Sequence, residues 1–274
     1  MKRFFTLTAA IIVAVAAYAA KPHDLVIVHF NDTHSHLDPE FGGEGGVLER
    51  AAFIDSVRKA EGRNNVLLLH AGDFEQGSSY FTILKGDLEI NLLNAMRYDC
   101  VVPGNHEFDN GIEDLGRRLS MLKCPVVCTN YDLSPFEAGK FVKPYVIVRK
   151  AGLKIGIIGI LCDLASVVAW ETSSRIPALG TVESVNKYAD ILKYEEGCDL
   201  VIVLSHAGFS GEAGINDTEL VPLTHNIDII VGGHSHTKLD SIYFGRNQYG
   251  RRIPIVQDWR WGVEAGVLRV SAGK

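Results

Sequence analysis

The chain has 274 residues, of which 47% are hydrophobic and 22% are charged, and its formal net charge is -6. This composition excludes an intrinsically disordered protein, and the length allows one large hydrophobic core or two modest ones. The negative charge argues against binding of a nucleic-acid polymer, because a phosphate backbone favours a basic surface. A small anionic substrate stays compatible with this charge when metal ions supply local positive charge.

The first residues predict an export signal. Lys2 and Arg3 precede an apolar run from Phe4 to Ala20, and Ala17-Tyr18-Ala19 matches an A-x-A cleavage site. We therefore expect residues 1–19 to be a signal peptide and the mature chain to be periplasmic or secreted. An uncleaved N-terminal anchor is the alternative. No later segment has the roughly 20 apolar residues that a membrane span needs, so we expect no membrane association after cleavage.

Downstream of the signal, short β-branched runs alternate with stretches whose apolar residues have helical spacing. The runs predict strands at 25–30, 66–70, 100–103, 126–129, 154–160, 200–205, 227–231 and 253–257. Helices are predicted at 47–60, 88–96, 111–122 and 182–195. This alternation is typical of α/β domains. Further apolar segments at 145–148, 242–244 and 263–270 lack an intervening helix, which predicts some antiparallel pairing and a mixed sheet.

No internal repeat, low-complexity tract or long linker interrupts the mature chain. One domain over residues 20–274 is therefore the simplest interpretation. Two glycine-containing loops, 38–46 and 207–217, are the segments that we expect to be mobile covers of a site, because glycine permits backbone changes that other residues resist.

Side chains of metal-binding types follow five of the predicted strands directly. In chain order they are Asp32 and His34, Asp73, Asn105, His206, and His234 and His236. Ligands of α/β proteins bind in the crevice outside the carboxyl ends of the strands, so groups that are distant in sequence can converge there. A hydrolytic two-metal centre needs mixed nitrogen and oxygen ligands, open positions and an anionic group that bridges the ions.

The spacing within two of these elements supports convergence. In Asp32-x-His34 and His234-x-His236, alternate residues of an extended segment would point to the same side, so each pair can offer two ligands to one cluster. A single histidine after a strand is more often an ordinary core or surface residue. Five such elements in order are hard to attribute to chance, and together they predict a metal centre.

These motifs resemble those of a known family. They are N-D-T-H at 31–34, A-G-D at 71–73, G-N-H-E-F-D-N-G at 104–111, S-H at 205–206 and G-G-H-S-H at 232–236. The sequence is similar to the calcineurin-like metallophosphoesterases and, within them, to the 5′-nucleotidase branch, for which the G-N-H-E-F-D block is highly specific. The resemblance covers essentially the whole mature chain. It implies a four-layer α/β/β/α sandwich with two mixed central sheets.

The resemblance also implies how the ligands divide between two divalent ions. Asp32, His34, Asp73 and His236 would hold one ion, and Asp73, Asn105, His206 and His234 would hold the other. Asp73 is then the bridging ligand, a role that suits a carboxylate because its charge offsets the repulsion between the cations. Zinc and manganese are the first candidates for these donors, and cobalt and iron(II) also suit them.

The reaction implied by the resemblance is hydrolysis of a phosphate ester by a metal-activated hydroxide, without a covalent enzyme intermediate. His106 would be a catalytic residue that contacts the phosphoryl group or the leaving oxygen. Asp109 would orient the His106 ring and favour its imidazolium form. Capping of the following helix is another role for Asp109 and is compatible with this pair.

We therefore expect a metal-dependent phosphoric ester hydrolase acting on 5′-nucleotides or similar small phosphate esters. A cyclic-nucleotide phosphodiesterase or a hydrolase of another oxyanion ester would use the same ligands, so the sequence leaves these alternatives open. A non-catalytic binding subunit is disfavoured by the complete ligand set together with His106 and Asp109.

Familiar two-domain members of the branch carry a C-terminal domain that binds the nucleoside. Here the segments 253–257 and 263–270 predict the closing strands of the metal domain, and only residues 271–274 follow. The nucleoside-binding domain is therefore expected to be absent. The remaining expectations are a single-domain phosphatase of broad or different specificity, a catalytic subunit with a separately encoded substrate-binding partner, or a truncated product.

Overall fold

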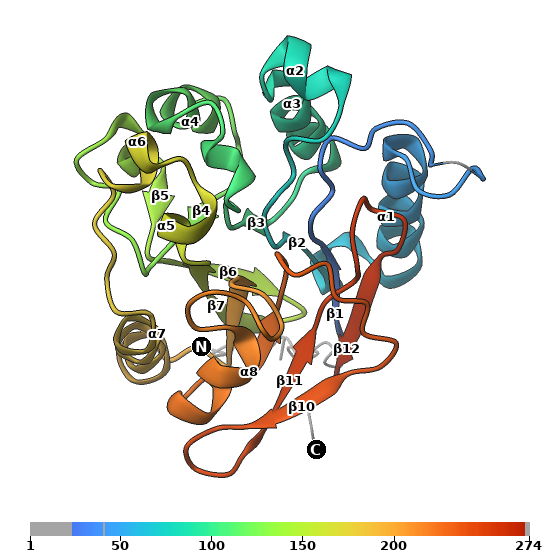
Figure 1. Ribbon diagram of the computed structural model, residues 1–274. Coiled ribbons are helices and arrows are strands. Elements are labelled where there is room, and N and C mark those ends of the chain that lie inside the picture. Colours follow the sequence, from blue (N-terminus) through green and yellow to red (C-terminus); the bar gives the residue numbers. More distant parts are fainter. Residues whose placement is uncertain (1–23, 41, 272–274) are drawn as a thin grey trace, which may run out of the picture.

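Two six-stranded sheets face each other in the structure, a computed structural model that describes residues 24–40 and 42–271. The strand order is β12-β1-β2-β3-β4-β5 in the first sheet and β10-β11-β9-β8-β7-β6 in the second. Helices cover the outer faces of both sheets (Figure 1). The predicted signal peptide at residues 1–19 lies outside the described residues.

Both sheets are mixed, as the sequence predicts. The first contains β1 (Leu25–Phe30), β2 (Val66–His70), β3 (Cys100–Val101), β4 (Val126–Val127), β5 (Val142–Lys143) and β12 (Gly266–Val270). The second contains β6 (Tyr145–Lys150), β7 (Leu153–Leu161), β8 (Leu200–His206), β9 (Ile229–Val231), β10 (Tyr243–Arg246) and β11 (Arg252–Val256). Strands β12, β6 and β10 pair antiparallel to their neighbours, and the other pairs are parallel.

The predicted helices are present with shifted ends. They are α1 (Val47–Glu61), α3 (Asp87–Met96), α4 (Ile112–Leu119) and α7 (Thr181–Asp190), the last continuing into a π-helical turn at Ile191–Glu195. Short helices that the periodicity did not reveal are α2 (Ser79–Leu84), α5 (Leu164–Val167), α6 (Trp170–Ser173) and α8 (Asp217–Leu220). Helices of one or two turns show too few apolar repeats to be recognised in sequence.

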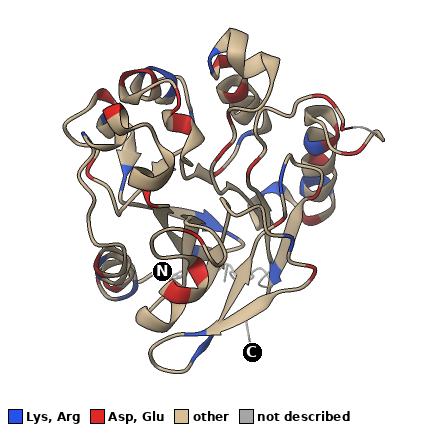
Figure 2. Cartoon of the chain, in the orientation of Figure 1, with Lys and Arg blue, Asp and Glu red and all other residues tan. Residues whose placement is uncertain are grey.

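Acidic and basic side chains are interspersed along helices such as α1 and α4 (Figure 2). In both helices the first turn carries acids and the last turn carries bases, an arrangement that complements the helix dipole. None of the described helices combines the length and the apolar content that crossing a bilayer requires.

The core has three apolar layers, which explains why the parallel strands are apolar at nearly every position. In β1, Leu25 and Ile27 point into the layer between the two sheets, whereas Val26, Val28 and Phe30 point to the layer under the helices. A third layer lies between the second sheet and α7 and α8. Strands covered on both faces become continuous hydrophobic runs. The four-layer α/β/β/α sandwich is therefore confirmed.

Four strands are shorter than predicted. Strand β9 begins at Ile229 rather than at residue 227, β12 begins at Gly266 rather than at residue 263, and β3 and β4 end early. The prediction extended β3 to residue 103 and β4 to residue 129, but the ladders end at Val101 and Val127. Beyond Val101 the chain leaves the sheet towards Gly104 and Asn105, and the Val102 amide makes one last bond to the His70 carbonyl at 3.1 Å. The apolar run outlasts the strand because Val102 still packs in the apolar layer between the sheets.

Candidate metal centre

The structure brings together all nine residues predicted for the site. Three groups of side chains each have donor atoms within 4.8 Å of one another: Asp32, His34 and His236; Asp73, His206 and His234; and His34, Asp73 and His106. Asn105 joins the second group, since its Oδ1 lies 3.3 Å from His206 Nε2. Asp109 joins through His106, as described below. These residues follow strands of both sheets, so the cluster lies across the end of the sandwich.

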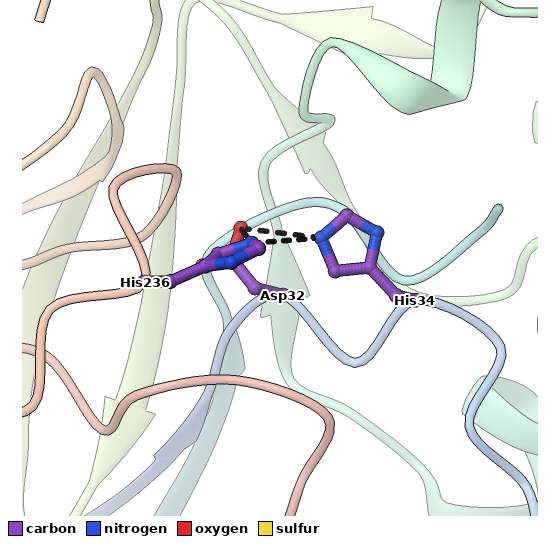
Figure 3. A group of neighbouring side chains, drawn as sticks. All are labelled: Asp32, His34 and His236. Atoms are coloured by element: carbon purple, nitrogen blue, oxygen red, sulfur yellow. Dashed lines mark hydrogen bonds and ion pairs between the residues drawn. The ribbon is translucent and has the colours of Figure 1, made fainter. Parts of the chain in front are cut away.

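The first group contains two imidazole nitrogens that face each other beside a carboxylate (Figure 3). His34 Nε2 lies 2.9 Å from His236 Nε2, and Asp32 Oδ1 lies 3.4 Å from His236 Nε2 and 3.9 Å from His34 Nε2. Burial lowers the pKa of His34 to about 4, so this ring is neutral near pH 7 and keeps an unprotonated nitrogen. Converging nitrogen and carboxylate donors of this kind fit a divalent cation.

The second group is ordered by a hydrogen bond behind it. His206 Nδ1 donates to the Ala71 carbonyl at 2.7 Å, which directs Nε2 towards Asp73 Oδ2 at 3.1 Å. A metal-binding histidine is commonly fixed in this way, because the second ring nitrogen sets the tautomer and the ring orientation. The His234 ring packs beside His206 with 5.0 Å between the ring centroids.

Asp73 lies between the two groups. Its Oδ2 is 3.8 Å from His34 Nε2 and 3.1 Å from His206 Nε2, and its Oδ1 accepts a hydrogen bond from the His106 amide at 2.9 Å. Burial opposes ionisation of Asp73, but the surrounding histidines, His206 first, outweigh it and hold the pKa of Asp73 below its ordinary value. A charged carboxylate at this position has the geometry of a bridging ligand.

The backbone is left-handed at five of the seven proposed ligands, so the predicted extended geometry of the two pairs is wrong. The φ angles are 48° at Asp32, 45° at His34, 76° at His234 and 49° at His236, and Asp73 has a φ of 52°. Non-glycine residues rarely adopt this region, and such conformations cluster at functional sites where surrounding contacts impose them. The side chains of each pair still converge, but through this turn geometry rather than through a strand.

Hydrogen bonds between the loops hold these conformations. The Asp32 amide donates to the Gly72 carbonyl at 2.9 Å, and the His34 amide donates to the Asp73 carbonyl at 3.0 Å. The His234 amide donates to Asp32 Oδ2 at 2.9 Å. The backbone at Gly104 approaches the Asp73 side chain so closely that a Cβ atom there would lie 2.1 Å from Asp73 Oδ1. The loops therefore fix one another's geometry.

His106 and Asp109 form the predicted pair. Asp109 Oδ2 lies 2.9 Å from His106 Nδ1, and the His106 ring is 5.2 Å from the His34 ring. Burial acts to lower the pKa of His106, but the hydrogen bond to Asp109 and the nearby carboxylates raise it above its ordinary value. The alternative role of Asp109 is wrong, because the N-cap of α4 is Gly111 and no described side chain caps that helix.

Sequence reasoning missed three neighbours of the cluster. Glu107 is buried and accepts hydrogen bonds from the amides of Asp73 at 2.9 Å, Glu75 at 3.1 Å and Gly104. Asn31 donates to Asp32 Oδ2 at 2.6 Å, and Glu212 Oε2 lies 3.8 Å from His234 Nε2. Glu107 and Asn31 belong to motifs already noted, and Glu212 to the 207–217 loop, but their contacts exist only in the folded chain.

The donor set suits a pair of divalent ions. It comprises carboxylate oxygens, one amide oxygen and four imidazoles, all mutually directed and mostly buried. Such mixed donors suit zinc, manganese, cobalt and iron(II), whereas magnesium and calcium prefer all-oxygen sites. The residues present therefore fit the dinuclear centre that the sequence predicts.

Comparison with known proteins supports this description. The sequence model of the calcineurin-like phosphoesterase family matches residues 25–238. The chain is 33% identical over 273 residues to a probable 5′-nucleotidase of Treponema pallidum, covering 90% of this chain and 45% of that protein. It is 31% identical over 274 residues to a snake venom 5′-nucleotidase of Naja atra, covering 90% of this chain and 50% of that protein.

Among solved structures, the fold is similar to that of a 5′-nucleotidase precursor from Thermus thermophilus. The TM-score is 0.81 and the sequence identity is 32%, with 90% of this chain and 51% of that chain covered. The chain thus spans about half the length of the relatives that it matches.

Proposed function

The chain belongs to the calcineurin-like phosphoesterase family, and from this premise we propose that it is a metal-dependent phosphoric ester hydrolase acting on 5′-nucleotides or similar small phosphate monoesters. The observation that carries the proposal is the convergence of mixed donors from five strand ends beside the His106–Asp109 pair. The names of the relatives as 5′-nucleotidases support the substrate class.

The family uses a dinuclear metal centre. We assign Asp32, His34, Asp73 and His236 to one ion, and Asp73, Asn105, His206 and His234 to the other. When bound, the two ions activate a water molecule and neutralise the phosphoryl oxygens. Zinc and manganese are the ions that we propose first, because the site mixes imidazole and carboxylate donors.

The protein groups have separate tasks around these ions. His106 donates a proton or a hydrogen bond to a phosphoryl oxygen or to the leaving oxygen through Nε2, because Asp109 engages Nδ1. The raised pKa of His106 favours the imidazolium form that can donate. Asp32 holds the His234 backbone as well as offering its carboxylate, so it also positions the segment that carries His234 and His236.

Three further assignments complete the proposal. Residues 1–19 act as an export signal that places the enzyme in the periplasm or outside the cell, and residues 20–274 form one metallophosphoesterase domain. Recognition of the nucleoside comes either from this domain's own loops or from a further binding domain, such as a separately encoded partner. The substrate panel below separates these two cases.

The test is phosphate release by the purified, metal-loaded chain from AMP, from an aryl phosphate, and from a cyclic nucleotide with a coupling phosphatase. We expect AMP hydrolysis that Asp73→Asn abolishes and that His106→Ala lowers about 10²- to 10⁴-fold. The matched control is His225→Ala, which removes a histidine paired with Asp190 at 2.9 Å outside the cluster and should leave activity unchanged.

Each other outcome has a defined meaning. Activity on the aryl ester alone would indicate that nucleoside recognition needs a partner. Activity only on the cyclic nucleotide would replace the monoesterase by a phosphodiesterase. Absence of all activity in a chain with bound metal would overturn the proposal of an autonomous hydrolase.

A further inference from the structure

A second cluster of buried polar atoms lies outside the metal centre, where β1 of the first sheet faces the end of β11 in the second. His29 follows Leu25 and Ile27 in the alternation of β1, so its side chain enters the layer between the sheets. Asp258 comes two residues after Val256, which lies in the same layer. The two residues are only 2% and 8% exposed.

These side chains leave polar atoms without partners. Within the described part of the chain, neither His29 Nδ1 nor Asp258 Oδ1 has a hydrogen-bond partner, and the 3.8 Å between them is too long for a hydrogen bond. Asp258 Oδ2, in contrast, accepts a hydrogen bond from the Gly266 amide at 2.9 Å. Burying polar atoms without partners is costly, so two such atoms that face each other mark a place where an ion or a water molecule can bind.

An ion pair between the two side chains does not offset the cost of burying these polar atoms. Burial lowers the pKa of His29 to about 4, so the ring is neutral near pH 7. Burial also raises the pKa of Asp258 well above its ordinary value. A bound cation would lower the pKa of Asp258 again, because it stabilises the carboxylate form. The unprotonated nitrogen of the neutral His29 ring could coordinate the same cation.

A cavity of about 300 Å³ lies beside the pair. Both His29 and Asp258 line it, and its wall carries two further carboxylates, Asp240 and Glu264. Glu264 forms an ion pair with Lys238, whereas Asp240 is exposed. The charge of the wall favours a cation over an anion as the occupant.

The distance between the two unpartnered atoms matches distances inside the metal centre. His34 Nε2 lies 3.8 Å from Asp73 Oδ2 and 3.9 Å from Asp32 Oδ1, and the corresponding value for His29 and Asp258 is 3.8 Å. One zinc ion can contact both atoms of such a pair, because Zn–N and Zn–O bonds of about 2.0–2.2 Å add to more than this separation.

We propose that His29 Nδ1 and Asp258 Oδ1 form an additional divalent-cation site that is separate from the dinuclear centre. Water molecules from the neighbouring cavity would complete the coordination of this ion. The ion would link β1 of the first sheet to the segment after β11 of the second. This segment is tied to the metal centre, because Asn31 accepts from the Asp258 amide at 3.1 Å and donates to Asp32 at 2.6 Å.

The experiment measures the zinc content of the tag-free full chain by mass spectrometry after equilibrium dialysis. We expect about one ion per chain beyond the dinuclear pair. Asp258→Asn and His29→Gln should each remove that ion, since an amide is a far weaker ligand than a carboxylate or an imidazole. The matched control is Asp55→Asn, which makes the same charge change at an exposed position of α1 and should retain every ion.

A second arm keeps this test independent of the proposed function. In an Asp73→Asn background, which should weaken the dinuclear centre, zinc should still raise the Tm, and adding Asp258→Asn should remove that rise. Wild-type zinc content in both Asp258→Asn and His29→Gln would overturn the proposal and leave water as the occupant. Unchanged zinc content in Asp73→Asn would instead contradict the dinuclear assignment and leave the additional site standing.

Discussion

At the scale of single residues, the chemistry of the site depends on side chains whose backbone is left-handed and whose carboxylates serve two purposes. Asp32 both offers oxygens to the cluster and accepts the His234 amide. Asp73 accepts the His106 amide while it lies between the two groups of histidines. The motifs show that carboxylates stand at these positions. They do not show that each carboxylate also accepts a backbone amide, because that contact forms only when distant loops come together.

Glu107 is expected to control metal affinity without contacting the ions. Its carboxylate accepts from the amides of Asp73, Glu75 and Gly104, so Glu107→Gln would place amide hydrogens against amide donors. We expect metal affinity to fall about 10- to 100-fold with the fold retained. Metal titration followed by calorimetry measures this, with Glu113→Gln, an exposed glutamate of α4, as the control. Equal affinity in Glu107→Gln and wild type would contradict the prediction.

Asp217 is expected to make stability depend on pH. It is fully buried, Ser205 donates to its Oδ1 at 2.5 Å, and its Oδ2 has no partner among the described residues. Burial raises the pKa of Asp217 from 3.8 to about 7, so the unfolded chain ionises first as pH rises. Between these values wild type should lose about 1.4 kcal/mol of stability per pH unit relative to Asp217→Asn, with no further change above about pH 7.

Urea unfolding of both proteins in chelator, at intervals from pH 3 to pH 8, measures this difference. Below the pKa of Asp217 in the unfolded chain, Asp217 is protonated in both the folded and the unfolded state. The stabilities of wild type and Asp217→Asn should therefore change in parallel with pH in that range. A stability difference between Asp217→Asn and wild type that stays constant across the whole range would show that Asp217 ionises equally in the folded and unfolded chains.

At the scale of elements, the contact between β4 of the first sheet and β7 of the second determines how closely the two sheets approach. Gly159 of β7 lies against the backbone of β4, and a Cβ there would lie 2.2 Å from the Val127 carbonyl oxygen. Gly156 of the same strand points to the other face, where a Cβ would meet the Leu192 side chain at 2.6 Å. A carbonyl in a strand cannot move aside, whereas a leucine side chain can change rotamer.

Gly159→Ala should therefore destabilise the fold more than Gly156→Ala. Overpacking of a well-packed core costs about 1–3 kcal/mol, and we expect Gly159→Ala at the upper end of this range. The midpoint of urea denaturation compares the two variants with wild type. If Gly156→Ala proves equally or more destabilising, the close approach of β4 and β7 does not limit the distance between the sheets.

At the scale of the whole molecule, the site joins the two sheets at one end of the sandwich. Asp73 follows β2 of the first sheet, and His206 ends β8 of the second. Ions held by both would act as a cross-link between sheets that meet mainly through apolar contacts. The stability of the whole chain is therefore expected to report on metal occupancy.

Chelation should lower the Tm of the metal-loaded chain. Ions present at about a hundred times their Kd stabilise the folded state by about 2.7 kcal/mol, and 1 kcal/mol corresponds to about 2–4 °C in a chain of this size. We expect a fall of about 5–10 °C that is reversed when zinc or manganese is restored. Asp73→Asn should show a much smaller fall. A Tm that chelator leaves unchanged in the wild type would contradict a site that spans both sheets.

The sequence by itself determined the layered α/β class, the order of the long elements and the identity of the candidate ligands. Short apolar runs rich in β-branched residues, such as Leu25–Phe30, indicate strands covered on both faces, and polar residues directly after them mark the crevice. Short helices such as α5 and α6 left no readable periodicity, because two turns are needed before a helical repeat shows.

Only the tertiary structure decided the geometry of the ligands and the roles of residues between motifs. The left-handed backbone at Asp32 and His34 is held by hydrogen bonds to another loop, so local sequence could not predict it. Glu107, His29 and Asp258 acquire their significance from atoms that are far away in the chain. Their positions follow from how the two sheets pack, which is a property of the whole fold and not of any segment.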